Sequence, residues 1–476
     1  MIPQSLCAAL GRRRRGPIAR GLLAALLGGA SLVLASACSD DDSTPVYEPG
    51  ACGQPEYSWL PRAQVGAVLS QEEDVLSPMA PSGMDSLLVQ FTDAFSPVPY
   101  GARVLRFRYT TQDRGQPVEA TGLLGVPWLP GGVAEERPVA LWLHGTTGFM
   151  GECAPSHRGG GDLLGAYLLA SLGYVVVAPD YIGMDAGANF NEPPAVRHAY
   201  LNIEQTAIGS LDAVRAGVAL VAGLEDNQVA ASIRDLVIWG GSQGGHAALA
   251  ADLLAPHYAP ELGVMAVVAL VPPTDLVGLG DYAVSSVNPA SPAVAAMLIA
   301  NHLWYAGGEG FEELLSTEAP WNAAEALPEA MYSGCDPGDA IEGATALDQV
   351  FDAELLAQVQ SEGWASAEPW RCYLEENSFA TSSVPWIRNT PTLMVLSAED
   401  RLVYTPVIRE DFDRLCQQGR TLEFLECAGA GHTEGAVWSL PEQTEWVAAR
   451  LAGEPWDPAR ICQRQAPVRC SGQPEE

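Results

Sequence analysis

Short apolar runs recur along the chain, each bounded by glycine, proline or polar turn residues. Runs of this kind are typical of strands buried on both faces of a parallel sheet. Helical periodicity over 208–222 and 246–254 lies between them, so the pattern predicts an α/β fold with a mostly parallel, doubly wound sheet. Residues 103–111 and 117–126 precede these runs and predict antiparallel strands at a sheet edge. The predicted parallel strands are 139–143, 175–178, 236–239, 264–271 and 392–396.

The alternation of strand and helix stops over residues 272–388. Because no simple loop is that long, we predict a cap domain inserted between the sixth and seventh strands. An apolar run over 294–304 predicts a helix within it. The insert's aromatic residues are interpreted either as the wall of an apolar substrate pocket or lid, or as the insert's own small core. Its tryptophans are Trp304, Trp321, Trp364, Trp370 and Trp386.

The N-terminal segment has the features of an export signal. Residues 1–37 contain five arginines and no acidic residue, and the arginines precede an apolar stretch over 21–35. Small residues then precede Cys38, as in a bacterial lipobox, where the cysteine is lipidated and becomes the new N-terminus; the alternative is an ordinary small-residue cleavage site. We therefore predict an exported protein, anchored to the bacterial outer membrane or cell surface through Cys38, or secreted.

The cysteine content also fits export. Of ten cysteines, Cys7 lies in the predicted signal and Cys38 in the lipobox, which leaves eight for four disulfides in an oxidising compartment. Spacing does not fix the connectivity, and no CxxC or His/Cys cluster has the spacing of a metal site. The pairs that lie near each other in sequence are Cys416 with Cys427, Cys462 with Cys470, and Cys335 with Cys372.

These patterns divide the chain into six predicted parts. They are a lipoprotein signal peptide (1–37), a lipidated N-terminus and tether (38–60), a first part of the α/β core (61–271), the inserted cap (272–388), a second part of the core (389–452) and a disulfide-stapled tail (453–476).

The charge balance excludes several functional classes. The chain has 25 basic residues, none of them lysine, against 58 acidic residues, for a formal charge of −33. Removing the five signal arginines leaves 20 basic and 58 acidic residues, hence about −38. A chain this acidic lacks the basic patch that binds nucleic acid. For the same reason, contact with a membrane is expected only through the lipid anchor. Without lysine, a nucleophilic serine would need a histidine as its base.

A candidate nucleophile lies between a predicted strand and a predicted helix. After the strand at 236–239 the chain reads Gly240-Gly241-Ser242-Gln243-Gly244, a GxSxG motif. In this context the motif forms a sharp elbow that exposes the serine oxygen, and the small residues permit the turn. We predict Ser242 as the nucleophile, with Gly240 and Gly244 as the elbow glycines.

The base and acid should follow the serine in chain order Ser, Asp, His. His432 lies in a glycine-flanked loop after the strand-like run 422–425 and before a predicted final helix over 438–451, so we predict it as the base. Asp400 follows the strand at 392–396 and is predicted to orient the histidine, with Asp275 as the alternative acid. His302 is interpreted as a structural or lid histidine of the insert.

The strand at 139–143 leads into His144-Gly145-Thr146-Thr147-Gly148, a small-residue loop that can turn a backbone N–H towards an oxyanion. We predict the amides of Thr146 and Gln243 as the oxyanion-stabilising pair. His144 is interpreted as a structural residue that braces this loop.

With these residues assigned, the sequence resembles the α/β-hydrolase superfamily, and within it the secretory lipase family and its bacterial relatives. The resemblance covers residues 84–271 and 389–452, and nothing specific matches in the cap. It rests on the 144–148 loop, the motif at 173–184, the helix at 211–216, Gly241-Ser242-Gln243-Gly244-Gly245, Asp400 and His432.

The resemblance implies a serine carboxylic ester hydrolase that acts on lipid or short-chain esters through an acyl-enzyme and requires no cofactor. Lipase and esterase are not separated, because specificity in such folds depends on the cap. Two alternatives stay open: a serine peptidase or amidase on the same fold, and a non-catalytic surface lipoprotein that binds apolar ligands through the cap. The oligomeric state is not predicted.

Overall fold

The computed structural model describes Tyr47 and residues 49–474, apart from 74–76, 89–96, 130–134, 160–162, 185–195, 225–228 and 309. The predicted signal peptide, Cys38 and the first part of the predicted tether lie outside these described residues. No helix among the described residues is long and apolar enough to cross a membrane.

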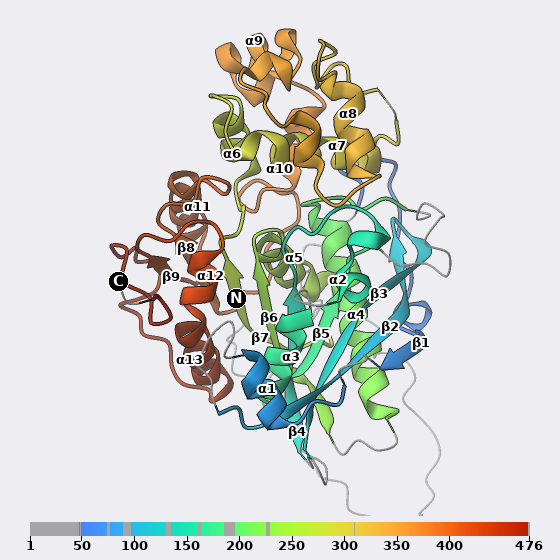
Figure 1. The fold of residues 1–476 in the computed structure, drawn as a ribbon, viewed down its shortest axis with the longest axis vertical. Helices are drawn as coiled ribbons and strands as arrows, with labels where there is room; N and C mark the ends of the chain where they lie inside the picture. The colour runs from blue at the N-terminus through green and yellow to red at the C-terminus, as the bar shows by residue number, and fades with distance from the viewer. Residues whose placement is uncertain are drawn as a thin grey trace, which may run out of the picture. The chain divides into compact units, whose positions relative to one another are not determined.

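A nine-stranded sheet of order β1-β2-β3-β5-β4-β6-β7-β8-β9 forms the centre of the fold (Figure 1). The pairs β1·β2, β2·β3 and β3·β5 are antiparallel, and every other pair is parallel. The strand order reverses beside β4, so the loops that leave β4 and β6 meet at a topological switch point, where such sheets bind ligands. The strands are β1 Val68–Glu73, β2 Gly101–Asp113, β3 Gln116–Trp128, β4 Glu136–Leu143, β5 Val175–Pro179, β6 Ala230–Gly241, β7 Val264–Leu270, β8 Thr392–Ser397 and β9 Leu422–Cys427.

The predicted fold, a mostly parallel doubly wound sheet with antiparallel edge strands, is confirmed. One strand, β1, was not predicted, because nearly all its side chains are exposed and its sequence has no apolar alternation. This additional edge strand shifts the numbering, so the predicted sixth and seventh strands are β7 and β8.

Helices cover both faces of the sheet. The buried side chains of α4, α5 and α11 share one hydrophobic cluster, whereas those of α1, α3 and α13 belong to a cluster on the other face. The predicted final helix over 438–451 corresponds to α13, and Ser439 separates it from the short helix α12. The core helices are α1 Pro81–Leu88, α2 Pro155–Arg158, α3 Leu164–Ser171, α4 Ile203–Ala222, α5 Gln243–Tyr258, α11 Thr405–Gln417, α12 Glu434–Trp438 and α13 Leu440–Leu451.

The chain between β7 and β8 forms a helical insert, drawn in yellow to orange at one end of the sheet in Figure 1. Trp304, Trp364 and Trp370 are buried, and Trp304 Nε1 donates to Asp113 Oδ1 at the end of β2 at 2.8 Å. The insert's helices are α6 Leu276–Ala283, α7 Ala290–Tyr305, α8 Ala323–Met331, α9 Ala353–Glu362 and α10 Trp370–Glu376.

Four disulfides are present, as the cysteine count predicts, but all three pairings suggested by sequence proximity are wrong. The bonds join Cys52 to Cys372, Cys153 to Cys335, Cys416 to Cys462 and Cys427 to Cys470. Cys416 lies near the end of α11, beside the start of β9, whereas Cys427 ends β9. At about 3.3 Å per residue, the strand separates these two cysteines beyond the roughly 7 Å Cα limit of a disulfide.

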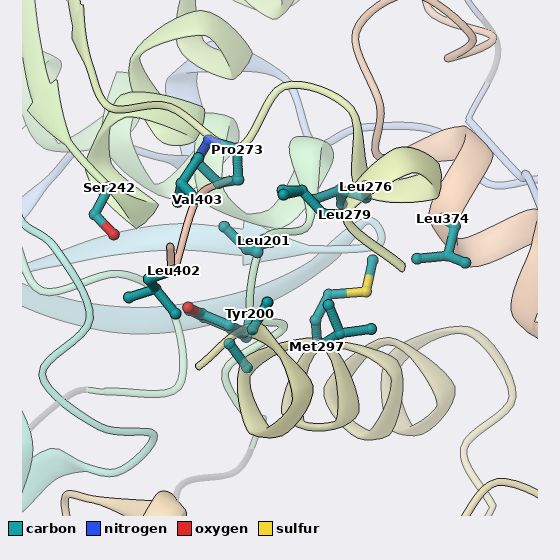
Figure 2. A pocket seen from close by; sticks show the side chains of 13 residues that line it. Tyr200, Leu201, Ser242, Pro273, Leu276, Leu279, Met297, Leu374, Leu402 and Val403 are labelled. Carbon is teal, nitrogen blue, oxygen red and sulfur yellow. The ribbon is translucent and has the colours of Figure 1, made fainter. Parts of the chain in front are cut away.

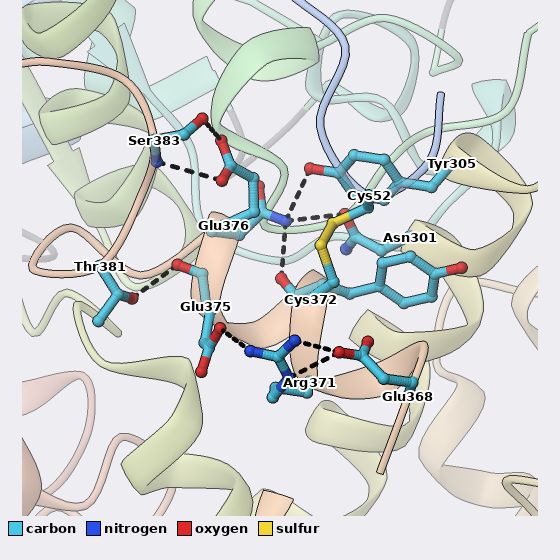
Figure 3. Close-up of a disulfide and its surroundings, with 12 residues drawn as sticks. Cys52, Asn301, Tyr305, Glu368, Arg371, Cys372, Glu375, Glu376, Thr381 and Ser383 are labelled. Atoms are coloured by element: carbon cyan, nitrogen blue, oxygen red, sulfur yellow. Dashed lines mark hydrogen bonds and ion pairs between the residues drawn. A yellow bond between two sulfur atoms is a disulfide. The ribbon is translucent and has the colours of Figure 1, made fainter. Parts of the chain in front are cut away.

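The first two disulfides attach the insert to the rest of the chain. Cys372 of α10 bonds to Cys52 in the N-terminal segment, in the surroundings that Figure 3 draws. Cys335 bonds to Cys153 in the short 3₁₀ turn Gly151–Cys153 after β4. The insert is therefore held covalently at two separate points, in addition to its own chain connections to β7 and β8.

Candidate active site

The serine predicted as nucleophile lies on a strained turn between β6 and α5. Ser242 has φ 58° and ψ −119°, a conformation that side-chain-bearing residues rarely adopt. A Cβ on Gly240 would approach the Gly244 carbonyl oxygen to 1.9 Å, and a Cβ on Gly244 would come equally close to the Leu143 oxygen. Both elbow positions therefore require glycine, because the turn, the helix start and β4 pack backbone against backbone.

The structure brings together the three side chains predicted from distant parts of the sequence. Ser242 Oγ lies 2.8 Å from His432 Nε2, and His432 Nδ1 lies 2.6 Å from Asp400 Oδ2. Asp400 Oδ1 accepts hydrogen bonds from the backbone N–H groups of Leu402 and Val403, at 2.9 and 3.0 Å. The buried carboxylate is thus fixed from both oxygens, and it holds the histidine with Nε2 free to accept the serine proton.

The alternative acid and the histidine of the insert have structural contacts elsewhere. Asp275 caps α6, where Oδ1 accepts the Gly278 N–H at 2.9 Å, and its other oxygen pairs with Arg414 at 3.1 Å. His302 lies in α7 of the insert, with Nδ1 3.4 Å from Tyr373 Oη.

The two predicted oxyanion amides flank the serine. The loop after β4 runs alongside the elbow, since a Cβ on Gly145 would lie 3.8 Å from Ser242 Cβ. Among the described residues, the backbone N–H groups of Thr146 and Gln243 donate no hydrogen bond. His144 braces the loop as predicted, with Nδ1 2.7 Å from the Gly145 oxygen.

Three buried rings behind these loops were not recognised in the sequence as site residues. This ring cluster consists of Tyr181, His198 and Tyr200, and its parallel pair, Tyr181 and His198, stacks at a 5.6 Å centroid distance. Tyr181 donates to the His144 carbonyl oxygen at 2.8 Å, and Tyr200 Oη lies 2.8 Å from Thr146 Oγ1. Burial raises the pKa of the Tyr200 hydroxyl, which stays protonated. No local motif identifies the ring cluster as part of the site, because its role depends on contacts between the β5–α4 connection and the loop after β4.

A cavity opens beside Ser242, and its lining is almost entirely apolar (Figure 2). Ser242 lies at one end of the residues drawn and Leu374 at the other. None of the insert's tryptophans lines the cavity, so the interpretation of these tryptophans as its wall is not supported. The core contributes Tyr200, Leu201, Ser242, Leu402 and Val403, and the insert contributes Pro273, Leu276, Leu279, Ala290, Ala293, Val294, Met297 and Leu374.

No group of three or more His, Cys, Asp or Glu side chains within the described part of the chain could hold a metal ion.

Comparison with known proteins identifies the family. The family model described as secretory lipase matches residues 160–457, more than half of the chain. The chain belongs to the secretory lipase family. The match includes the elbow, the insert and both loops that carry Asp400 and His432. Membership of the secretory lipase family, together with four disulfides, indicates an exported protein.

A curated relative and two solved structures are also similar to this chain. Lipase 4 of Candida albicans is 24% identical over 318 residues, which cover 64% of this chain and 63% of that protein. The rice cell wall degrading esterase LipA from Xanthomonas oryzae superposes with a TM-score of 0.64 at 21% identity, covering 81% of this chain and 97% of that one. Candida antarctica lipase A in its closed state gives a TM-score of 0.57 at 16% identity, covering 89% and 90%. The α/β-hydrolase fold is therefore shared with these structures.

Proposed function

We propose that this protein is a serine carboxylic ester hydrolase, a lipase or esterase. The observation that carries the proposal is the continuous hydrogen-bonded series Ser242–His432–Asp400 beside an apolar cavity. Family membership supports the same reaction class.

The proposed reaction proceeds in two halves. As Ser242 Oγ bonds to the ester carbonyl carbon, His432 Nε2 takes the serine proton and Asp400 stabilises the resulting imidazolium. The carbonyl oxygen becomes negative and accepts hydrogen bonds from the Thr146 and Gln243 amides. The carbon–oxygen bond to the alcohol then breaks, His432 returns the proton to the leaving oxygen, and an acyl-serine remains. Water attacks in the same way, with His432 as base, and releases the acid and the free serine.

The cavity supports a substrate whose acyl or alkyl part is apolar. Its wall offers aliphatic side chains from α6, α7 and α10 of the insert, and among its lining residues only Ser242 and Tyr200 have side-chain polar atoms. Such a wall favours hydrocarbon chains, because each buried CH₂ group contributes about 0.8 kcal/mol.

The test is the Ser242→Ala variant, which should abolish hydrolysis of p-nitrophenyl esters and labelling by a fluorophosphonate probe. Ser171→Ala is the control, since Ser171 is buried in α3 and its hydroxyl donates to the Leu168 carbonyl oxygen, not to His432. Labelling of Ser242→Ala at the wild-type level would contradict the proposal. Release of amine from aminoacyl amides without ester hydrolysis would indicate a peptidase instead.

We also propose that the mature protein is lipid-anchored through Cys38, on the support of the lipobox-like sequence alone. Cys38→Ala should lose incorporation of labelled palmitate and move from the membrane pellet to the supernatant. Cys7→Ala, within the predicted signal, should retain both properties. Persistent palmitate incorporation in Cys38→Ala would contradict the anchor.

A further inference from the structure

The side chain that follows the proposed nucleophile is held by a single histidine. Gln243 is 1% exposed, and its Nε2 lies 2.7 Å from His198 Nε2. Its Oε1 is buried and accepts no hydrogen bond among the described residues. The amide is therefore fixed through one contact only, made by a residue 45 positions earlier in the chain.

The protonation of His198 follows from its two partners. Its Nδ1 lies 3.3 Å from the Ile182 carbonyl oxygen, which can only accept, so Nδ1 carries the proton. Nε2 is then the acceptor, which matches the amide N–H donors of Gln243. Burial and, to a lesser extent, the nearby His144 lower the pKa of His198 to about 3, although the hydrogen bond to the Ile182 carbonyl opposes the shift. The ring is thus neutral wherever the proposed reaction can run.

The ring cluster leaves His198 little freedom to move. The ring stacks on Tyr181 with an interplanar angle of 8°, and Tyr200 contacts it edge-on at 6.4 Å. The two tyrosines bond the β4 loop through the His144 oxygen and Thr146 Oγ1. One cluster of rings therefore touches both sources of the proposed oxyanion amides: Thr146 directly, and Gln243 through its side chain.

We propose that His198 is a positioning residue that holds Gln243 so that its backbone N–H points at the developing oxyanion. The proposal rests on the proposed ester hydrolysis. Gln243 begins α5 directly after the strained serine, and its side-chain contact is what prevents this first helical residue from rotating. A hydrogen-bond donor stabilises an oxyanion only if it is already correctly oriented when the charge develops. A small displacement of the Gln243 N–H should therefore lower kcat more than it weakens substrate binding.

The experiment compares His198→Ala, His198→Gln and Gln243→Ala with the wild type in steady-state ester hydrolysis. His198→Ala should lower kcat by about 10- to 100-fold and change KM by less than about twofold. His198→Gln should recover most of kcat, because its Oε1 can accept the Gln243 N–H. Gln243→Ala keeps the backbone amide but loses the same contact, so it should reproduce the loss, and adding it to His198→Ala should lower kcat no further.

His246 provides the matched control. It is as buried as His198 and lies on the same helix as Gln243, but its Nε2 lies 2.9 Å from the Asn377 carbonyl oxygen and not from an oxyanion loop. His246→Ala should lose comparable thermal stability while kcat stays within about twofold.

The possible failures are distinguishable. If the wild type and His246→Ala hydrolyse no ester, the proposed function is wrong. If the wild type is active but Gln243→Ala and His198→Ala both keep full kcat, or if His246→Ala loses as much kcat as His198→Ala, the positioning role is overturned. Additive losses in the double variant would also overturn it. Should His198→Ala fail to fold, Gln243→Ala alone decides the question.

Discussion

The core and the insert contribute different chemistry to the cavity beside Ser242. On the core side, hydrogen bonds of 2.6 to 3.0 Å fix Ser242, His432 and Asp400 on loops at one end of the sheet. On the insert side, every lining residue is aliphatic or Met297, and none donates or accepts a side-chain hydrogen bond. Under the proposed function, changes in the core are therefore expected to affect the chemical step, and changes in the insert to affect which substrate fits.

The two regions also differ in how they are attached. The core is continuous through nine paired strands, while the insert is joined by Cys52–Cys372 and Cys153–Cys335, which bridge 320 and 182 residues of sequence. Covalent links over such distances restrict the unfolded chain and hold the wall of the cavity in place. Substrate selection is thus expected from the shape of the wall rather than from large movements of the insert.

The largest effect is expected in the core, from Asp400→Asn. Replacing the carboxylate removes stabilisation of the His432 imidazolium and disturbs its tautomer, which lowers kcat by about 10⁴-fold in serine hydrolases of this design. Progress curves with a short-chain p-nitrophenyl ester measure the loss. Asp275→Asn is the control: it weakens the cap of α6 but should leave kcat within about threefold. Equal losses in both variants would show that the acid is wrongly assigned.

The core could be predicted from sequence because its signals are local. The apolar runs, the glycines around Ser242 and the chain order of Asp400 and His432 each specify geometry within a few residues. Even there, β1 escaped prediction because an exposed edge strand carries no apolar alternation.

The remaining features depend on contacts between distant segments. His198 looks like any buried histidine in the sequence, and only the fold brings it to Gln243. The same applies to the partners of Cys52 and Cys153, which follow from where the insert lies and not from spacing. Tertiary hydrogen bonds and disulfide pairings leave no periodic pattern in the sequence. The composition of the insert indicated an apolar wall as one interpretation, but it did not identify the residues that form the wall.

An intermediate effect is expected where the insert, the core and the N-terminal segment meet. Glu204 of α4 accepts hydrogen bonds from Tyr57 Oη at 2.6 Å and Trp59 Nε1 at 2.9 Å. Burial raises the pKa of Glu204 to about 7; the two hydrogen bonds oppose the shift, and Asp113 and Glu376 add to it. The folded state thus binds this proton more tightly than the unfolded chain, so the stability it contributes is complete below about pH 4.5 and is lost as pH rises through 7.

Glu204→Gln removes this titration. Between pH 5 and pH 8 the wild type should lose on the order of 2 kcal/mol of unfolding free energy relative to the variant, measured by urea denaturation at both pH values. Glu119→Gln, at an exposed position of β3, should show no such difference. If the unfolding free energies of wild type and Glu204→Gln change with pH in parallel, the raised pKa of Glu204 does not contribute to the stability of this region.

The smallest effect is expected in the insert, and it distinguishes the role of the insert from that of the core most directly. Met297 of α7 is 1% exposed and lines the cavity, so Met297→Trp fills space there without touching Ser242, His432 or Asp400. We expect kcat/KM for octanoyl esters to fall about tenfold, since losing room for one or two methylene groups costs about 1–3 kcal/mol, while acetyl esters change less than about twofold. Met297→Leu, which conserves volume, should leave both substrates nearly unaffected. Equal losses for acetyl and octanoyl esters would mean that the insert also shapes the reacting centre, because a wall that only selects substrates cannot slow an ester too short to reach it.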